Sequence, residues 1–207
     1  VTVGVSPTLF YDPVGRVVAT LHPNLTWEKV IFDPWRQESW DGNDTVLGTD
    51  PTDDTNVDPA SDPDVGGYFE RLDDTDYLPT WYQVRIDGGL GNPERDAAEK
   101  AAAHANTPSI VHFDSLGRPF LSIADNGLEG QYLTRTEQEL EGNPLRIIDA
   151  RGNVVMAYQV EVEGNPPVLG YDIAGRQLYE HSMDAGERWV LPDIGGKPIR
   201  SWDSRGH

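Results

Sequence analysis

The sequence predicts a mainly β protein, an antiparallel sheet of hairpin repeats with one inserted α-helix. The 207 residues include 21 Gly and 16 Pro but only 2 Met, a composition typical of many turns and short strands. A motif of an apolar or aromatic residue, Asp, two variable residues and Gly recurs along the chain. Runs rich in branched apolar residues follow the motif glycines, and such runs favour β-strands.

The motif occurs six times, and the copies are about 21 to 23 residues apart where they are most regular. That length suits two short antiparallel strands with their turns, so the repeating unit is predicted to be a hairpin. FDPWRQ, from Phe32, is a further copy without the glycine. The six copies are YDPVGR from Tyr11, FDSLGR from Phe113, IDARGN from Ile148, YDIAGR from Tyr171, PDIGGK from Pro192 and WDSRGH from Trp202.

The chemistry of the motif indicates a turn. An Asp at its start can accept hydrogen bonds from backbone N–H groups nearby, and a Gly three residues later allows positive φ. We therefore expect these residues to be structural and not catalytic. They are Asp12, Gly15, Arg16, Asp114, Gly117, Arg118, Asp149, Gly152, Asp172, Gly175, Arg176, Asp193, Gly196, Asp203 and Gly206.

The repeats predict three segments: first repeats over 1–40, an insertion over 41–108, and further repeats over 109–207 that continue beyond the chain end. The insertion opens with an acidic stretch without Lys or Arg, over 41–67, which predicts an exposed loop. An aromatic segment follows over 68–86. A helix is predicted over about 93–106, with Asn92 as its N-cap, Pro93 in its first turn and Pro108 after its end.

Charge and composition exclude several functions. The formal net charge is -19, which repels nucleic-acid phosphates and anionic membrane surfaces, so we expect no nucleic-acid or membrane partner. The chain has no Cys and thus no disulfide, thiolate zinc site or cysteine nucleophile. No stretch is long and apolar enough to span a bilayer, and the first residues lack a signal-peptide pattern.

We expect no catalysis and no cofactor, because the sequence contains no G-x-S-x-G, P-loop or H-E-x-x-H motif. The histidines are scattered, and acidic pairs such as Asp73 with Asp74 or Glu161 with Glu163 are inevitable among 35 acidic residues. Calcium is the better chemical alternative, because the acidic stretch offers hard oxygen ligands, although its spacing departs from an EF-hand. The calcium candidates are Asp50, Asp53, Asp54, Asp58, Asp62 and Asp64. The histidines are His22, His104, His112, His181 and His207.

Aromatic residues leave a third class of function open, a β-rich surface module that binds a glycan or a protein. Cross-strand packing is the simpler interpretation of Trp and Tyr in strands. The aromatic residues concerned are Trp27, Trp35, Trp40, Trp81, Tyr82 and Trp189.

The residues also resemble a known family. YDPVGRVVATLHPN, WEKVIFDPWRQESWD, YLPTWYQVR, HFDSLGRPFL, EGNPLRIIDARGNVVM and DAGERWVLPDIGGKPIRSWDSRGH are similar to the Rhs/YD repeats, most closely to the carboxy-terminal repeats of the B component of bacterial insecticidal toxin complexes (SpvB/TcdB-like). The YDxxGR units are only moderately specific, and the long strings between them are more diagnostic.

The resemblance implies a segment of a spiralling β shell, in a secreted complex, that encloses a cytotoxic effector. Its partners would be the rest of the shell polypeptide, the C component and the enclosed effector. The family's autoproteolytic aspartates belong to the C component, and no residue here matches that region. We therefore expect a structural, toxin-shielding role.

Overall fold

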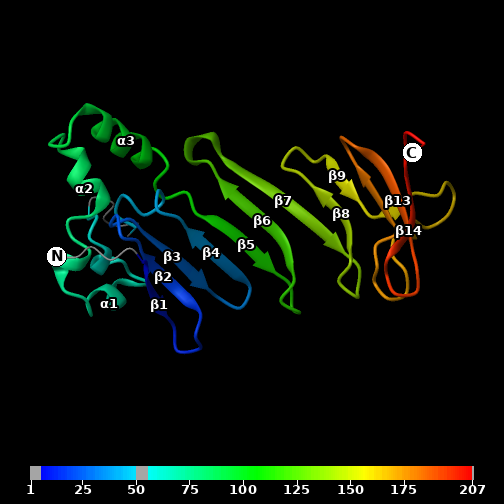
Figure 1. Ribbon diagram of the computed structural model, residues 1–207, viewed down its shortest axis with the longest axis horizontal. Coiled ribbons are helices and arrows are strands. Elements are labelled where there is room, and N and C mark those ends of the chain that lie inside the picture. Colours follow the sequence, from blue (N-terminus) through cyan, green and yellow to red (C-terminus); the bar gives the residue numbers. More distant parts are fainter. Residues whose placement is uncertain (1–5, 50–55, 207) are drawn as a thin grey trace. The chain divides into compact units, whose positions relative to one another are not determined.

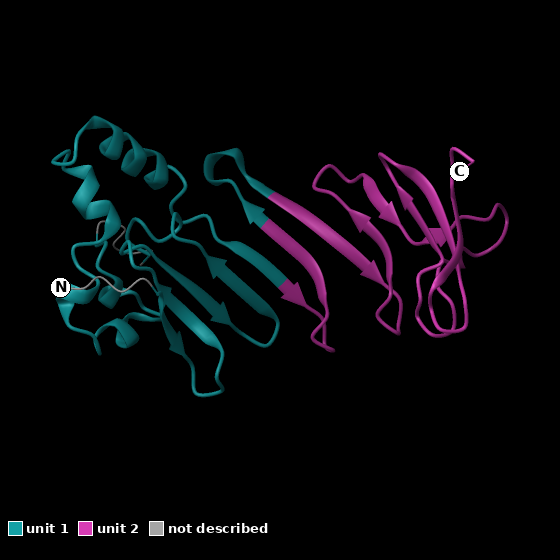
Figure 2. Ribbon diagram, in the orientation of Figure 1, with its two compact units in different colours: residues 1–111, 124–131 teal, residues 112–123, 132–207 magenta. Residues whose placement is uncertain are grey.

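A computed structural model describes residues 6–49 and 56–206 of the chain. It confirms the prediction of a mainly antiparallel β fold. Twelve strands follow one another in a single sheet in the order β1-β2-β3-β4-β5-β6-β7-β8-β9-β12-β13-β14, and β10 and β11 form a separate pair (Figure 1). Two compact units divide the chain, and the boundary passes through β5 and β6 (Figure 2). Unit 1 comprises residues 1–111 and 124–131, and unit 2 comprises 112–123 and 132–207.

Unit 1 begins with two hairpins in which each strand pairs with the next. The sheet turns at motif residues between β1 and β2 and at the glycine-free copy between β3 and β4. The strands are β1 Thr8–Tyr11, β2 Val17–Leu21, β3 Trp27–Phe32 and β4 Arg36–Trp40. The next three are β5 Ser109–Phe113, β6 Pro119–Asp125 and β7 Gln131–Gln138.

Between β4 and β5, residues 41–49 and 56–108 are described and contain three α-helices, so the predicted helix has two short companions there. Of the two, only α2 has a side-chain cap, whereas α1 has none. Thr80 and Gln83 form a reciprocal capping box at the start of α2, which satisfies two free N–H groups. The helices are α1 Gly66–Phe69, α2 Trp81–Ile86 and α3 Asn92–Ala102, with short 3₁₀ turns at Pro59–Ser61, Asp74–Asp76 and Gly127–Glu129.

Helix α3 differs from its predicted bounds at both ends. Gly91, with φ 98°, occupies the N-cap position without a side-chain cap, and Asn92 is the first helical residue. The helix ends at Ala102, before the predicted 106, and turns follow up to Asn106, whose φ is 60°. The backbone N–H of Asn106 donates to the carbonyl of Asp44 at 3.0 Å, so a tertiary contact redirects the chain before Pro108 can stop the helix.

The core of unit 1 lies between strands β1 to β3 and the inserted segment. Phe69 is fully buried at the end of α1, with ring centroids 5.0 Å from Phe10 and 5.4 Å from Trp27. Burying such aromatic side chains is a main source of stability in a domain of this size. The insertion therefore supplies one side of this core. The buried apolar cluster comprises Phe10, Ala19, Leu21, Trp27, Val65, Phe69 and Tyr77.

Gly66 permits the close approach of α1 to the chain before it. A Cβ at this position would lie 2.3 Å from the carbonyl oxygen of Ala60, which no side chain could accommodate without backbone movement. Glycine is thus required where the acidic stretch meets the core.

Unit 2 continues the meander with little core of its own. Tyr179 is its one buried large apolar residue among those described, and its ring lies 4.4 Å from that of Trp189 on the neighbouring strand. Most other side chains on its sheet are half-buried or exposed. The strands are β8 Pro144–Ile148, β9 Val154–Ala157, β10 Gln159–Val160, β11 Val168–Leu169, β12 Tyr179–Ser182, β13 Gly186–Pro192 and β14 Pro198–Asp203.

Candidate functional site

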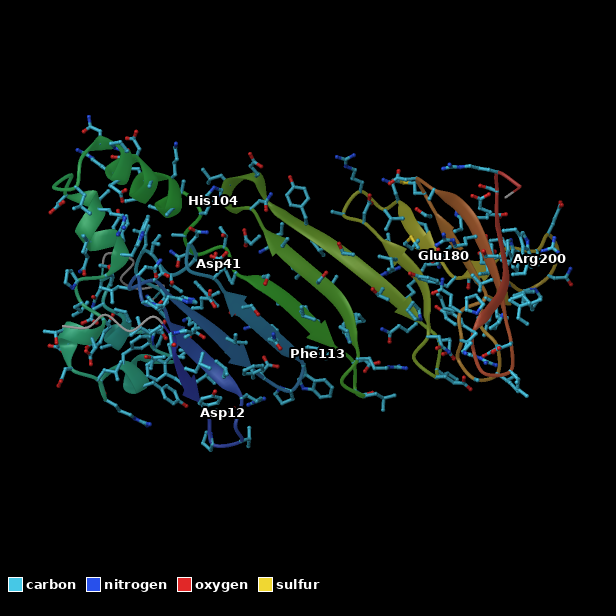
Figure 3. The ribbon with its side chains drawn as sticks, viewed as in Figure 1. Asp12, Asp41, His104, Phe113, Glu180 and Arg200 are labelled. Atoms are coloured by element: carbon cyan, nitrogen blue, oxygen red, sulfur yellow. The ribbon has the colours of Figure 1, made fainter. Side chains whose placement is uncertain are left out.

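All six motif copies adopt the same turn. In each copy the glycine N–H donates to the carbonyl of the motif Asp, at 2.9 to 3.0 Å, and the glycine has a φ between 74° and 85°. In the copy at Asp172, Oδ1 accepts from the backbone N–H groups of Ala174 and Arg176, both at 2.9 Å. This is the hydrogen-bond pattern that a short carboxylate favours in turns. Figure 3 shows Asp12 in the turn after β1.

The pKa of four motif carboxylates, those of Asp12, Asp114, Asp149 and Asp172, lies below its ordinary value. The backbone N–H of Arg118, and then its guanidinium, holds the pKa of Asp114 below its ordinary value of 3.8. Arg176 acts in the same way on the pKa of Asp172. Hydrogen bonds to a carboxylate favour its charged form, so Asp114 and Asp172 are held in their turns as hydrogen-bonded anions.

In unit 2, two motif arginines each link their own turn to the next turn on the same edge of the sheet. Nη1 of Arg118 donates to the carbonyl oxygens of Glu139 and Leu140 at 3.3 and 3.2 Å. Nη1 of Arg176 donates to those of Asp193 and Ile194, both at 3.2 Å. The Nε of each arginine meanwhile binds its own motif Asp, at 2.7 and 2.6 Å. One guanidinium thus joins two successive turns.

In unit 1 the first motif arginine uses an aromatic partner instead. The guanidinium of Arg16 lies 4.3 Å from the ring centroid of Phe32, immediately before the glycine-free turn. A guanidinium over a ring face is attracted by the ring quadrupole. The link between successive turns is therefore present in both units, with different chemistry.

Sequence analysis missed a further turn of this type. In ELEGN the N–H of Gly142 donates to the carbonyl of Glu139 at 3.1 Å, and Glu139 Oε1 accepts from the N–H of Asn143 at 2.8 Å. Backbone N–H groups of Glu141 and Asn143 lower the pKa of Glu139. The spacing from Glu139 to Gly142 is that of the motif, so a search allowing Glu at the first position would have found it.

The buried ammonium of Lys29, on β3, joins the acidic insertion to the sheet. Sequence analysis did not single out this residue. Nζ of Lys29 lies 2.7 Å from Asp62 Oδ2 and 2.8 Å from Asp64 Oδ2. The side chains of Lys29 and Asp62 are 1% and 0% exposed. Asp62 also accepts from the N–H groups of Asp64 and Val65 and from the hydroxyl of Thr49.

This network revises the prediction of an exposed acidic loop. Asp62 is buried, and so is Asp44, which binds the Thr107 backbone N–H and hydroxyl across 63 residues at 3.2 and 2.9 Å. Burial raises the pKa of Asp44, against the lowering effect of hydrogen bonds from Asp41 and Thr107. A low-dielectric position is tolerable for a carboxylate only when it is paired or hydrogen-bonded, and both aspartates meet that condition.

The calcium candidates do not gather into a site within residues 6–49 and 56–206, where no group of three or more His, Asp and Glu could hold a metal ion. The carboxylates of Asp62 and Asp64 both bind the Lys29 ammonium. Asp58 caps the 3₁₀ turn that follows it through the N–H of Ala60. The remaining candidates, Asp50, Asp53 and Asp54, lie outside the described residues.

The histidines and paired carboxylates occupy separate elements. His22 Nε2 lies 3.0 Å from Glu28 Oε1, and His112 packs near Phe120. His104 follows α3, His181 is in β12, and His207 lies outside the described residues. Asp73 and Asp74 begin a 3₁₀ turn, and Glu161 and Glu163 lie in the exposed segment before β11.

Unit 1 contains a polar cavity of about 530 Å³ beside β3 and β4. Its lining includes Asp41 and His104, which are labelled in Figure 3, and Trp40, whose ring centroid is 4.7 Å from Nζ of Lys29. A second cavity, of about 420 Å³, shares Glu28, Asp41 and Asn43 with the first and contains Trp81 in its lining. Trp40 and Trp81 therefore line adjoining cavities. Trp81 also lines a small third cavity with Tyr82 and the buried Trp27. The other two predicted aromatic residues lie elsewhere, since Trp189 packs on Tyr179 and Trp35 is 58% exposed in the turn after β3.

Removing a motif arginine should loosen the turn that it reaches. We expect Arg176→Gln to lower the opening free energy of the turn at 193–197 by about 1 kcal/mol, a modest value because the Arg176 side chain is 38% exposed. Hydrogen exchange of the Asp193 and Gly196 amides measures this. The exposed Arg151, in a motif without such a link, is the control, and equal effects of Arg151→Gln and Arg176→Gln at 193–197 would contradict the link.

Removing the buried ammonium should destabilise unit 1. Lys29→Met leaves the buried Asp62 carboxylate without its cation, which costs about 3–5 kcal/mol of unfolding free energy. The double variant Lys29→Met with Asp62→Asn should lose less than the sum of the two single variants, as expected for groups in contact. Urea unfolding followed by Trp fluorescence measures this, with the exposed Lys100→Met as control. Additive losses would show that the two groups act independently.

No family model matches the chain, and no curated protein is similar to it. Solved structures do share its fold. A Tc holotoxin pore of Photorhabdus luminescens with a mutation in TccC3 aligns with a TM-score of 0.62 at 19% identity, over 97% of this chain and 7% of that chain. The crystal structures of TcdB2-TccC3 and TcdB2-TccC3-Cdc42 each align with a TM-score of 0.60, at 19% identity over the same shares.

The chain spans 7% of the length of these chains. At 19% identity the likeness is one of fold. The described helices include none long and apolar enough to span a membrane. The alignments with these solved structures show that this chain has the fold of a section of a Tc toxin complex.

Proposed function

We propose that the chain is a section of the β wall of a secreted Tc-type toxin shell that encloses a cytotoxic effector, with no catalysis of its own. The observation that carries this proposal is the row of linked turns, in which motif aspartates hydrogen-bond within the turns that reverse the strands and Arg118 and Arg176 join successive turns. Such a structure extends by adding hairpins, because each contacts its neighbours in the same way. The fold likeness to Tc toxin complexes supports the toxin context.

The sheet of unit 2 suits a wall. Its strands pair in sequence order, and motif turns reverse them at both edges, which keeps the strip continuous. With few buried side chains of its own, the sheet depends on hydrogen-bond ladders and turn links more than on a packed interior. The proposed partners are the adjoining shell polypeptide, a C component and the enclosed effector.

The test uses the complete shell polypeptide that contains this section, purified with its C component and effector. We expect the effector to resist added protease until the shell is denatured. A variant with Arg118→Gln and Arg176→Gln should expose the effector faster than the matched variant with Arg151→Gln and Arg205→Gln. An effector that is digested at the same rate with and without the intact shell would reject the proposal.

The adjoining cavities of unit 1 favour a second candidate, a glycan-binding surface module. Trp rings beside carboxylates and amides offer stacking and hydrogen bonds to sugar hydroxyls. If this function holds, oligosaccharides from a glycan array should change Trp fluorescence on titration, and Asn43→Ala should weaken that binding. Binding that is equal for Asn43→Ala and for Asn165→Ala, an exposed position in unit 2, or no binding to the array, would remove this candidate.

A further inference from the structure

The two ends of the insertion are fastened to each other at Asp44. The backbone carbonyl of Asp44 accepts the N–H of Asn106 at 3.0 Å, and Oδ1 of its side chain accepts the N–H of Thr107 at 3.2 Å, across 63 residues. Asp44 is only 6% exposed. We call these contacts of Asp44 with Asn106 and Thr107 the latch, because they close the chain segment between them into a loop.

The hydroxyl group of Thr107 has two acceptors in the latch. Its Oγ1 lies 2.9 Å from Oδ1 of Asp44 and 2.9 Å from the backbone carbonyl oxygen of His104. A hydroxyl group donates one hydrogen and accepts at two lone pairs. When Asp44 is ionised, the single hydroxyl hydrogen of Thr107 therefore has to be shared between two acceptor oxygens.

One added proton on Asp44 completes this chain of hydrogen bonds. A protonated Asp44 donates from Oδ1 to Oγ1 of Thr107, and the Thr107 hydroxyl is then free to donate to the carbonyl of His104. Oδ2 of Asp44 still accepts the N–H of Asp41 at 2.7 Å. Both 2.9 Å contacts of the Thr107 hydroxyl are thus full hydrogen bonds only in the neutral form of Asp44.

The immediate surroundings of Asp44 also favour its neutral form. Asp41 lies in the same turn, and its carboxylate accepts the N–H of Asp44 at 3.1 Å. Burial, as the largest cause, and the negative charge of Asp41 raise the pKa of Asp44, and the hydrogen bonds from Asp41 and Thr107 oppose them. A buried carboxylate beside a like charge is expected to hold its proton more strongly.

The other charged groups around Asp44 line the same cavity. From β3, the carboxylate of Glu28 contributes to this lining and binds His22, and the ammonium of Lys29 is bound by two carboxylates of the acidic stretch. After α3, the exposed residue His104 adds an imidazole to the lining. The nearest lysine is therefore already paired with other carboxylates.

We propose that Asp44 makes the latch proton-dependent: when the pH falls, Asp44 takes up a proton and holds the two ends of the insertion together more tightly. The proposal rests on the geometry of unit 1 alone, so it can hold or fail independently of the shell function and of glycan binding.

The sign of this dependence follows from linkage. A group whose pKa is raised by folding contributes stability that is present below its ordinary pKa and is lost as the pH rises through its folded-state pKa. The latch should therefore strengthen from neutral pH down toward 3.8, the ordinary pKa of Asp44. Asp114 has a lowered pKa, so its turn should not strengthen over this range.

Hydrogen exchange of the Asn106 amide measures the opening of the latch, because this amide donates to the backbone of Asp44 in either protonation state. After correction for the intrinsic exchange rate, we expect its protection to rise between pH 7 and pH 4. The rise should be about tenfold for each unit by which the folded-state pKa of Asp44 exceeds the ordinary one. The Gly117 amide, in the turn of Asp114, is the control and should show no such rise.

Two variants identify the group that takes up the proton. Asp44→Asn cannot ionise and should remove the pH dependence at Asn106, whereas His104→Gln retains the backbone carbonyl and should leave it unchanged. A ¹³C NMR titration of the Asp44 carboxyl group in the unsubstituted chain tests the same point if Asp44→Asn does not fold. The proposal would be overturned by a carboxyl pKa at or below 3.8, by pH dependence that persists in Asp44→Asn, or by its loss in His104→Gln.

Discussion

The fold depends on one local constraint, a carboxylate that closes a five-residue turn on itself. The motif Asp accepts backbone N–H groups within its own turn, and the glycine three residues on takes the positive φ that the reversal requires. Because both requirements are met within a few residues, the turn can form wherever the motif occurs, and the antiparallel order of strands follows from repeating it. The residue after the glycine, the fifth of the turn, then decides whether neighbouring turns are joined, since Arg118 and Arg176 reach the next turn but Asn153 binds its own Asp.

Different kinds of contact stabilise the two units. Unit 1 buries an aromatic cluster between its first strands and the insertion, and the buried ammonium of Lys29 secures the acidic part of that insertion. Unit 2 has almost no such core, and its contacts are ladders, turn links and a Tyr179–Trp189 pair. A sheet with two largely uncovered faces is suited to a structure completed by other chain segments, which is consistent with its fold likeness to sections of much longer chains.

Acidic residues have two roles that composition alone cannot separate. Most of the charge is exposed, but a minority of carboxylates is structural, either in turns, as at Asp114, or in the interior, as at Asp62. The interior ones explain why an acidic stretch without Lys or Arg can still fold onto a sheet: its cation comes from β3, 33 residues earlier. Only Asp62 of the two carboxylates that bind this cation is buried, and Oδ2 of both Asp62 and Asp64 binds the ammonium of Lys29 and not a metal ion.

The sequence by itself determined the features that depend on neighbours along the chain. The β class, the motif turns and the presence of a helix near 93–106 follow from Asp-to-Gly spacing, branched runs and an Ala-rich stretch, all local signals. Only the tertiary structure decided that Lys29 pairs with Asp62 and Asp64, that Asp44 holds Thr107, and that Trp27 belongs to the core. These contacts join residues tens of positions apart, and no local sequence pattern distinguishes Lys29 or Trp27 from the other Lys and Trp residues. Only in the folded structure does burial make an unpaired charge destabilising and a large aromatic ring stabilising.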